Sequence, residues 1–192
     1  MNPVHYLAID TETGGLLPGQ SALLSLSIVP SWDHAPLTLH FQPIGQLEDN
    51  ACLVNGYTPE LWKVRGAVPL KHGLIAVQQW LEASGSWEKK AHPLAHNAAF
   101  DAAFLNAAER LTGISLSLPR RWRCSMVTLL AAQDAGHIDQ RAAASLDSLG
   151  SLSGYWATHP RAPYHDATQD ARCCLHGYQW LISQLARKDA DS

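Results

Sequence analysis

Residues 4–15 read V-H-Y-L-A-I-D-T-E-T-G-G, and this stretch decides the fold and the chemistry expected of the chain. The apolar run over residues 4–9 predicts a short strand that enters the core. Asp10 and Glu12 follow two residues apart, so both carboxylates project from one face of the strand. Two such carboxylates repel each other unless a cation lies between them. The pair is therefore either a solvated strand end or part of a metal site, and the two glycines that follow let the backbone turn away.

Outward from this stretch, the chain alternates between strand and helix patterns. Residues 22–29 and 37–41 predict two more strands, so the first third should form an antiparallel meander. Residues 150–163 predict a loop. We expect helices over 58–64, 70–81, 98–111, 126–135, 142–149 and 167–185, and short strands over 93–96 and 122–125. Early strands followed by alternating strands and helices indicate an α/β sandwich with a mixed sheet.

A third acid occurs in H-N-A-A-F-D-A-A-F-L, residues 96–105. Asp101 lies one turn into the expected helix, from where its carboxylate can reach the centre of the sheet. The alternative is a first-turn acid that is stabilised by the helix dipole. The apolar residues around it suit a buried helical face.

The stretch H-D-A-T-Q-D-A, residues 165–171, supplies a fourth acid and a histidine. Asp166 followed by Gln169 matches an N-capping pattern, so Asp166 is expected to be structural. Asp170 then lies about one turn into the helix and can point inward. His165 is either a surface residue or a general base, because histidine side chains titrate near neutral pH.

Together these residues carry a family resemblance. D-x-E-T-G at residues 10–14, N-A-A-F-D at 97–101 and H-D-A-x-x-D at 165–170 resemble the three motifs of the DnaQ-like (DEDDh) 3′→5′ exonucleases. V-N-G-Y-T-P-E at 54–60 is similar to a loop segment of that family. The resemblance implies a ribonuclease H-like α/β fold, with a mixed five-stranded sheet flanked by helices. It also implies one exonuclease domain over residues 1–192, with a short disordered tail near 187–192.

The resemblance assigns a role to each of the five residues. Carboxylate oxygens suit hard cations, so the four acids are expected to bind two Mg²⁺ or Mn²⁺ ions. By resemblance, Asp10 bridges both ions, Glu12 and Asp170 hold the ion that activates water, and Asp101 acts through metal-bound water. His165 takes the proton from the attacking water in a two-metal hydrolysis of the phosphodiester bond that releases nucleoside 5′-monophosphates.

Other residues near the motifs are expected to contact the terminal nucleotide. By resemblance, the leucine after the glycines wedges against the terminal base, the threonines beside Glu12 offer polar contacts, and two residues before the 98–111 helix contact a phosphate. The predicted substrate-binding residues are Thr11, Thr13, Leu16, His96 and Asn97. Asn97 can equally cap the helix that follows it. The basic cluster at 120–123 encloses Trp122, which serves either nucleic-acid stacking or a solvated loop.

Net charge and composition limit the substrates and partners that the chain is expected to bind. The 192 residues carry a formal net charge of −3, without the basic excess of proteins that hold long duplexes by electrostatics. We therefore expect single-stranded DNA or RNA 3′ ends as substrate, with DNA favoured weakly. Four cysteines without a C-x-x-C pair, no secretory signal and no long apolar run predict a cytoplasmic protein without a membrane segment. The alternative to an exonuclease is an inactive binding module with the same fold. A polymerase or other protein partner is possible but not indicated by the sequence, and the oligomeric state is open.

Overall fold

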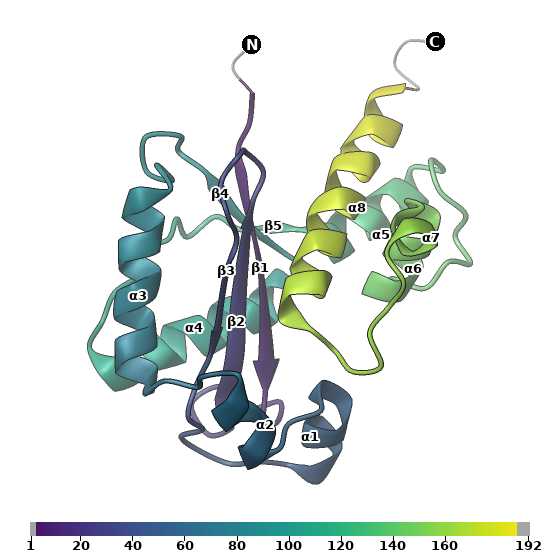
Figure 1. Cartoon of the computed structure of the whole chain (residues 1–192). Helices are drawn as coiled ribbons and strands as arrows, with labels where there is room; N and C mark the ends of the chain where they lie inside the picture. Colours follow the sequence, from purple (N-terminus) through teal and green to yellow (C-terminus); the bar gives the residue numbers. More distant parts are fainter. Residues whose placement is uncertain (1–2, 188–192) are drawn as a thin grey trace.

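The centre of the molecule is a five-stranded mixed sheet in the order β3-β2-β1-β4-β5 (Figure 1). The structure, a computed structural model, describes residues 3–187. Strands β1–β3 form an antiparallel meander, whereas β4 and β5 add in parallel beyond β1. The strands are β1 (Tyr6–Thr13), β2 (Leu23–Pro30), β3 (Leu37–His40), β4 (His92–Ala95) and β5 (Arg123–Cys124). This is the ribonuclease H-like α/β fold expected from the motifs.

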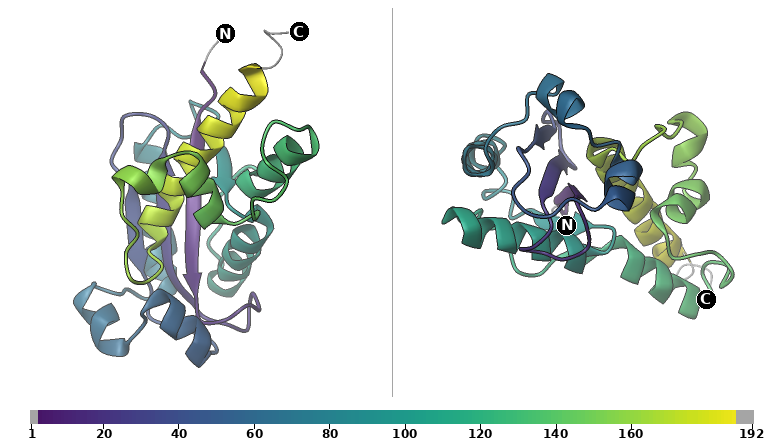
Figure 2. Two further views of the ribbon diagram at one scale, coloured as in Figure 1. Left: turned by 90° about the vertical axis from the view of Figure 1, so that its right-hand side faces the viewer. Right: turned by 90° about the horizontal axis from the view of Figure 1, so that it is seen from below.

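Helices cover both faces of this sheet. Seen from below in Figure 2, α3 and α4 lie on one side of the strands and α8 on the other, while α1 and α2 lie beyond the end of β1 (Figure 1). The helices are α1 (Asp49–Asn55), α2 (Pro59–Val64), α3 (Leu70–Ala83), α4 (Ala98–Thr112), α5 (Ser125–Asp134), α6 (Leu146–Leu152), α7 (Tyr155–Thr158) and α8 (Ala167–Arg187).

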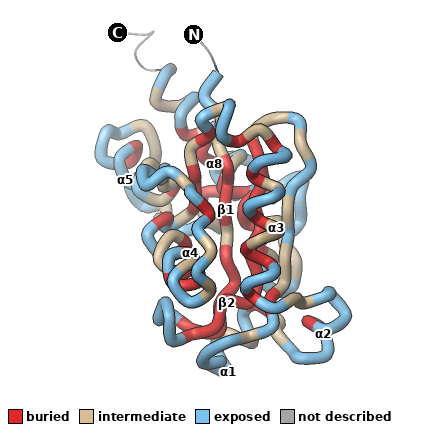
Figure 3. Tube along the Cα trace, turned by 90° about the vertical axis from the view of Figure 1, so that its left-hand side faces the viewer, coloured by how far each residue is buried: buried red, intermediate tan, exposed pale blue. Residues whose placement is uncertain are grey.

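The core follows from the apolar pattern of the central strands. Every residue of β2 is buried, and β1 is buried over most of its length, as the buried band through both strands in Figure 3 shows. One core cluster fills the space under α3 and α4 and includes Phe41, Leu74 and Phe104. On the other face, α8 packs Cys174 and Tyr178 against the sheet. Strands buried on both faces are rigid supports for whatever side chains stand at their ends.

Most helices match the sequence expectations, and three helical segments differ. Residues 49–55 form α1, and four residues inside the expected loop 150–163 form α7. The helix expected over 142–149 is α6, which begins later because the Ser145 hydroxyl caps it by accepting a hydrogen bond from the Ser148 amide at 3.2 Å. No helix within residues 3–187 is long and apolar enough to cross a bilayer. Most of the tail expected near 187–192 lies outside the described residues.

Candidate metal centre at the end of the central strand

Asp10 and Glu12 lie inside the central strand, because β1 continues to Thr13 and does not end at residue 9. Their backbone partners are Ser27 and Ser25 of β2, and the register shifts immediately after Glu12 in a β-bulge. Glu12 is 8% exposed and Asp10 is partly buried. Both acids therefore stand on backbone that the sheet fixes, and bulges commonly re-aim side chains beside active sites.

Asp101 reaches the same region from the first turn of α4. Its side chain is buried, and the Thr11 hydroxyl donates to its Oδ1 atom at 2.9 Å. Thr11 lies between Asp10 and Glu12, so this hydrogen bond ties the α4 carboxylate directly to the acidic end of β1. The bond also explains why an acid is tolerated at a buried position in an otherwise apolar helix face.

The fourth acid and the histidine come from the start of α8. Asp166 caps this helix, since its Oδ1 accepts hydrogen bonds from the amides of Thr168 and Gln169 at 3.1 and 3.0 Å. The expected return bond from Gln169 does not form, because its side chain instead bonds the backbone of residues 160 and 162. The cap fixes the first turn of α8, which carries the buried carboxylate of Asp170.

His165 lies on the approach to α8 and faces this carboxylate. Its Nδ1 atom is 3.4 Å from Asp170 Oδ2, although the side chain is about half exposed. Ligand atoms of Glu12, His165 and Asp170 all lie within 4.8 Å of one another. Residues from the first strand and the last helix are thus brought into a single cluster.

Burial raises the pKa of all four acids, and repulsion between the acids adds to the shift for Asp10 and Glu12. Burial is the largest cause for Asp10, whose pKa is raised well above its ordinary value, with Asp101, Glu12 and Asp170 adding to the shift. Burial followed by the charge of Asp170 raises the pKa of Glu12 to about 8. The pKa of Asp101 rises to about 7 through burial, and that of Asp170 is also raised by burial. Such a concentration of shifted acids marks a functional site and costs stability unless positive charge compensates it.

Two oxygen atoms of the cluster have no protein partner. Glu12 Oε1 and Asp170 Oδ1 are buried and accept no hydrogen bond. Buried polar atoms without a partner are rare in folded proteins, and a bound cation satisfies such oxygen atoms. Oxygen-only acids with raised pKa values and free lone pairs suit a hard divalent cation such as Mg²⁺ or Mn²⁺. The residues present therefore fit the predicted metal ions.

Arg161 is the member of this site that the sequence did not reveal. It lies in the loop before α8, and its Nη2 atom is 3.6 Å from Asp170 Oδ2 and 3.2 Å from His165 Nε2. A single arginine in a loop carries no motif or periodicity, so no sequence signal identified it. The path of the folded chain is what brings its charge to the acids.

Comparison with solved structures gives the same fold. Exonuclease I of E. coli in complex with a dT13 oligonucleotide superimposes with a TM-score of 0.76 at 15% identity, over 98% of this chain and 43% of that one. The nuclease domain of 3′hExo, a DEDDh family member bound to rAMP, superimposes with a TM-score of 0.69 at 14% identity, over 93% of this chain and 92% of that one. The fold is that of the DEDDh exonucleases.

The length of the matched chains and the lack of sequence matches limit which properties can be transferred to this protein. Exonuclease I from Methylocaldum szegediense has a TM-score of 0.70 at 17% identity, over 97% of this chain and 41% of that one. The chain thus spans less than half the length of these exonuclease I chains. No protein-family model and no curated protein matches the sequence.

In this DEDDh-like fold, the predicted nucleotide contacts lie in different environments. Leu16 is 73% exposed just beyond the acids and is free to meet a base. The hydroxyl of Thr13 donates to the Gly15 carbonyl at 2.7 Å, so it is already used inside the protein, as is that of Thr11. These contacts to substrate stay predictions, and each threonine hydroxyl can still accept a hydrogen bond.

His96 is partly buried, whereas Asn97 is exposed. The Nδ1 atom of His96 shares a 2.8 Å hydrogen bond with the Ser125 hydroxyl, and its Nε2 atom is enclosed without a partner. Asn97 is exposed with φ 67°, in the left-handed region that asparagine tolerates better than most residues, and its side chain forms no capping bond. Asn97 therefore occupies the N-cap position of α4 without a capping bond from its side chain, and its predicted contact with a phosphate is untested.

The basic cluster before β5 divides into exposed arginines and a packed tryptophan. Arg120 and Arg121 are exposed, whereas Trp122 is partly buried against the main core cluster. Arg120 and Trp122 line a surface cavity of about 680 Å³ beside α4. The packing of Trp122 favours the loop interpretation over base stacking.

Proposed function

We propose that this chain is a metal-dependent 3′→5′ exonuclease and that residues 1–192 form one exonuclease domain. Its substrate would be the 3′ end of single-stranded nucleic acid, with DNA favoured, and its products nucleoside 5′-monophosphates. One observation carries the proposal: Glu12, His165 and Asp170 converge within 4.8 Å, and two carboxylate oxygens among them are buried without a partner. A nuclease fold alone does not establish activity, whereas this set of groups provides the chemistry.

The four acids are the proposed ligands of two ions: Asp10, Glu12, Asp101 and Asp170. When bound, two Mg²⁺ or Mn²⁺ ions would supply Lewis-acid activation of a water molecule and neutralise the charge on the phosphate and the departing 3′ oxygen. Deprotonated carboxylates are required for this, and a bound cation would offset the burial and the repulsion that raise the pKa values of Asp10 and Glu12 in the free protein. The acids therefore give the ions both ligands and an electrostatic reason to bind.

His165 would act as the general base through a defined nitrogen atom. An arginine side chain can only donate, so His165 Nε2 accepts from Arg161 and the ring proton resides on Nδ1, facing Asp170. Nε2 is then the atom that takes the proton from the attacking water. The Asp170 carboxylate beside Nδ1 would stabilise the imidazolium that forms, as carboxylates do beside other catalytic histidines.

Single-stranded ends suit the surface around these groups. Leu16 and Leu17 follow the acidic strand and are both more than half exposed, so they offer apolar area to an unstacked base. The net charge of −3 argues against a long electrostatic track for a duplex. Exonuclease I of similar fold has been solved with dA13, dT13 and dA16 oligonucleotides.

The direct test is a gel assay on 5′-labelled single-stranded DNA, RNA and duplex DNA with Mg²⁺, Mn²⁺ or a chelator. We expect a metal-dependent ladder that shortens from the 3′ end, with single-stranded DNA cut fastest and none in Asp10→Ala. Circular dichroism establishes that the variant is folded. A folded wild type that produces no ladder on any substrate would reject the enzyme and favour a binding module.

A further inference from the structure

Arg161 connects the acidic centre to an anchor outside it. On one side, Nη2 lies 3.6 Å from Asp170 Oδ2 and 3.2 Å from His165 Nε2. On the other, Nη1 pairs with the carboxylate of Asp147, and the guanidinium lies 5.2 Å from the centre of the Trp156 ring. The side chain is 25% exposed, so these contacts are partly shielded from water.

The charge of Arg161 already acts on the proposed metal ligands. It is the arginine that opposes the rise in the pKa of both Glu12 and Asp170. It also occupies Nε2, the atom of His165 that must be free to receive a proton. The guanidinium thus does two things that are incompatible with an ion-loaded, active centre.

We propose that Arg161 is the internal counter-cation of this centre: it neutralises Asp170 and covers His165 Nε2 until divalent ions bind, and it competes with those ions. The inference rests on the proposed function, since it concerns the same acids. Ion binding breaks the contacts of Nη2 with Asp170 and His165 while Nη1 keeps its pair with Asp147, which frees Asp170 and the histidine together.

Electrostatics requires this competition. A guanidinium remains charged at all working pH values, so it cannot relieve the repulsion by losing a proton. Displacing the guanidinium therefore lowers the apparent affinity for the ion, as for any ligand that must shift a conformational equilibrium. Asp147 and the face of the Trp156 ring already contact the other side of the guanidinium, so it can leave Asp170 without losing all of its partners.

The test measures Mn²⁺ binding by isothermal titration calorimetry on protein without nucleic acid. Arg161→Gln should bind Mn²⁺ roughly 5- to 20-fold more tightly than the wild type, because a competing charge near 4 Å is lost. Arg161→Lys keeps the charge and should stay closer to the wild type. Arg172→Gln is the matched control, since this exposed arginine lies two residues from Asp170 and has no role in the centre.

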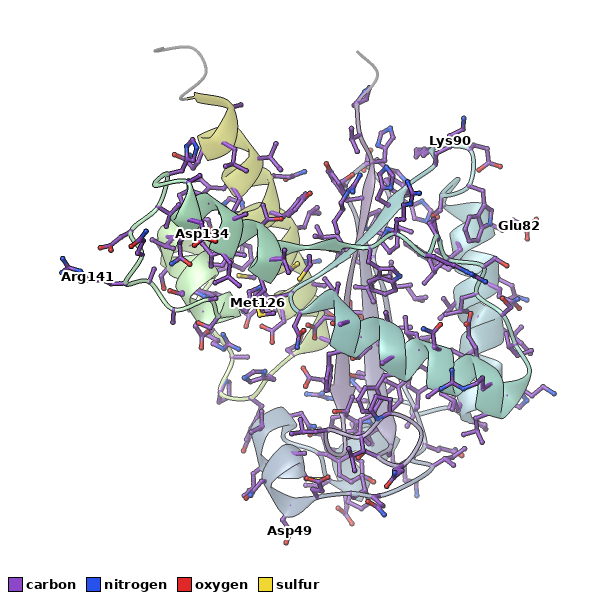
Figure 4. All side chains as sticks on the ribbon, turned by 180° about the vertical axis from the view of Figure 1, so that it is seen from behind. Asp49, Glu82, Lys90, Met126, Asp134 and Arg141 are labelled. Atoms are coloured by element: carbon purple, nitrogen blue, oxygen red, sulfur yellow. The ribbon has the colours of Figure 1, made fainter. Side chains whose placement is uncertain are left out.

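A second pair of variants tests the same competition if Arg161→Gln does not fold. Asp147→Asn removes the outer carboxylate and leaves Arg161 with Asp170, so Mn²⁺ should bind about 2- to 5-fold more weakly. Asp134→Asn is its control, because Asp134 is exposed at the last residue of α5 (Figure 4) and the net charge changes equally.

The outcomes separate the inference from the proposed function. If the wild type binds Mn²⁺ and Arg161→Gln binds it equally or more weakly than Arg172→Gln, the inference is overturned and the exonuclease stands. Equal affinities in Asp147→Asn and Asp134→Asn overturn it as well. If no form of the folded protein binds Mn²⁺ or Mg²⁺, both proposals fall.

Discussion

The two halves of the acidic centre are held in different ways. Asp10 and Glu12 stand on β1, which is paired to β2 along its length and to β4 over residues 6–8. His165 lies on an exposed segment outside any helix or strand, and its own amide donates to the Val54 carbonyl of α1 at 3.0 Å. The two strand carboxylates are thus fixed by the sheet, whereas the proposed proton acceptor has room to adjust. The acids on the strand are held in place, and the histidine on the loop can change position.

If the strand acids carry the ions, their removal should have the largest effect on catalysis. Asp10→Asn and Glu12→Gln should each lower kcat by roughly 10³-fold or more, because charge stabilisation of the transition state is lost. Their melting temperatures without metal should rise, since each replaces a carboxyl group that is destabilised by burial and by the neighbouring acids. Single-turnover kinetics and thermal melts measure both effects. Normal turnover in either folded variant would contradict the metal assignment, and Asp134→Asn should change neither quantity.

Substitution of His165, in the loop half of the centre, should have a smaller effect than substitution of the strand acids. His165→Asn should lower kcat by roughly 10²–10⁴-fold, the usual range for a general base. Mn²⁺ affinity should fall much less than in Asp170→Asn, because the imidazole contributes a proton acceptor more than a ligand. Calorimetry beside the kinetics distinguishes the two. A loss of Mn²⁺ binding as large as in Asp170→Asn would identify His165 as a metal ligand instead.

The raised pKa values predict an unusual pH dependence of stability in metal-free protein. The pKa of Glu12 rises from 4.5 to about 8, so the folded state holds a proton that the unfolded state has already lost between those values. The contribution of Glu12 to stability is therefore complete below about pH 4.5 and is lost as the pH rises through 8. Urea unfolding in a chelator at pH 5 and pH 8 should show Glu12→Gln gaining stability over the wild type at the higher pH.

This comparison of variants is needed because other groups act in the opposite direction. Burial lowers the pKa of His40 and His96, which favours the folded state as the pH rises. The difference between wild type and Glu12→Gln cancels these shared contributions. A difference that is constant from pH 5 to pH 8, or that shrinks, would show that Glu12 is not held protonated. Saturating Mn²⁺ should reverse the advantage of the variant at pH 8.

The smallest expected effect concerns the support of the loop. Gly56 has φ 66°, and a Cβ there would lie 2.7 Å from the ring of Tyr164, the neighbour of His165. Gly66 has φ 73° and nothing within 4 Å of such a Cβ. Alanine at either site should cost about 1 kcal/mol of unfolding free energy through backbone strain. Only Gly56→Ala should also slow turnover, by up to roughly tenfold, through the displaced loop.

Denaturant unfolding and steady-state kinetics on both glycine variants separate strain from loop support. Equal turnover in Gly56→Ala and Gly66→Ala would show that Tyr164 does not transmit a shift to His165. Slower turnover in both would assign the effect to a general loss of stability.

The sequence predicted the parts of the molecule whose pattern is local. Leu70, Leu74, Val77 and Leu81 repeat at helical spacing and all are buried on α3. The Thr58 cap and Pro59 define the start of α2. In contrast, α1 has no side-chain N-cap, and only the left-handed Gly56 at its end identifies it. Such short helices are stabilised by tertiary packing, which a single sequence does not contain.

The same distinction applies to the site. Asp10, Glu12, Asp101, His165 and Asp170 lie in short motifs with a defined order, so their convergence was predictable. Arg161 depends on the path of the loop around Trp156 and Asp147, and no local pattern encodes that path. The β-bulge after Glu12 was likewise invisible, because it arises from the pairing of two strands.

The two adjacent buried cysteines of α8 can report how often this helix separates from the elements packed against it. Cys173 and Cys174 are almost inaccessible, and burial raises the pKa of both thiols, so neither presents a thiolate to reagents while α8 is docked on the sheet. Cys174 packs against the sheet, whereas the Cys173 thiol donates to the Leu146 carbonyl of α6, so alkylation of Cys174 requires the helix that carries Asp170 to leave the strands. The labelling rate of Cys174 therefore measures how often α8 detaches, and its slowing by added Mn²⁺ would report how strongly bound ions hold that helix on β1.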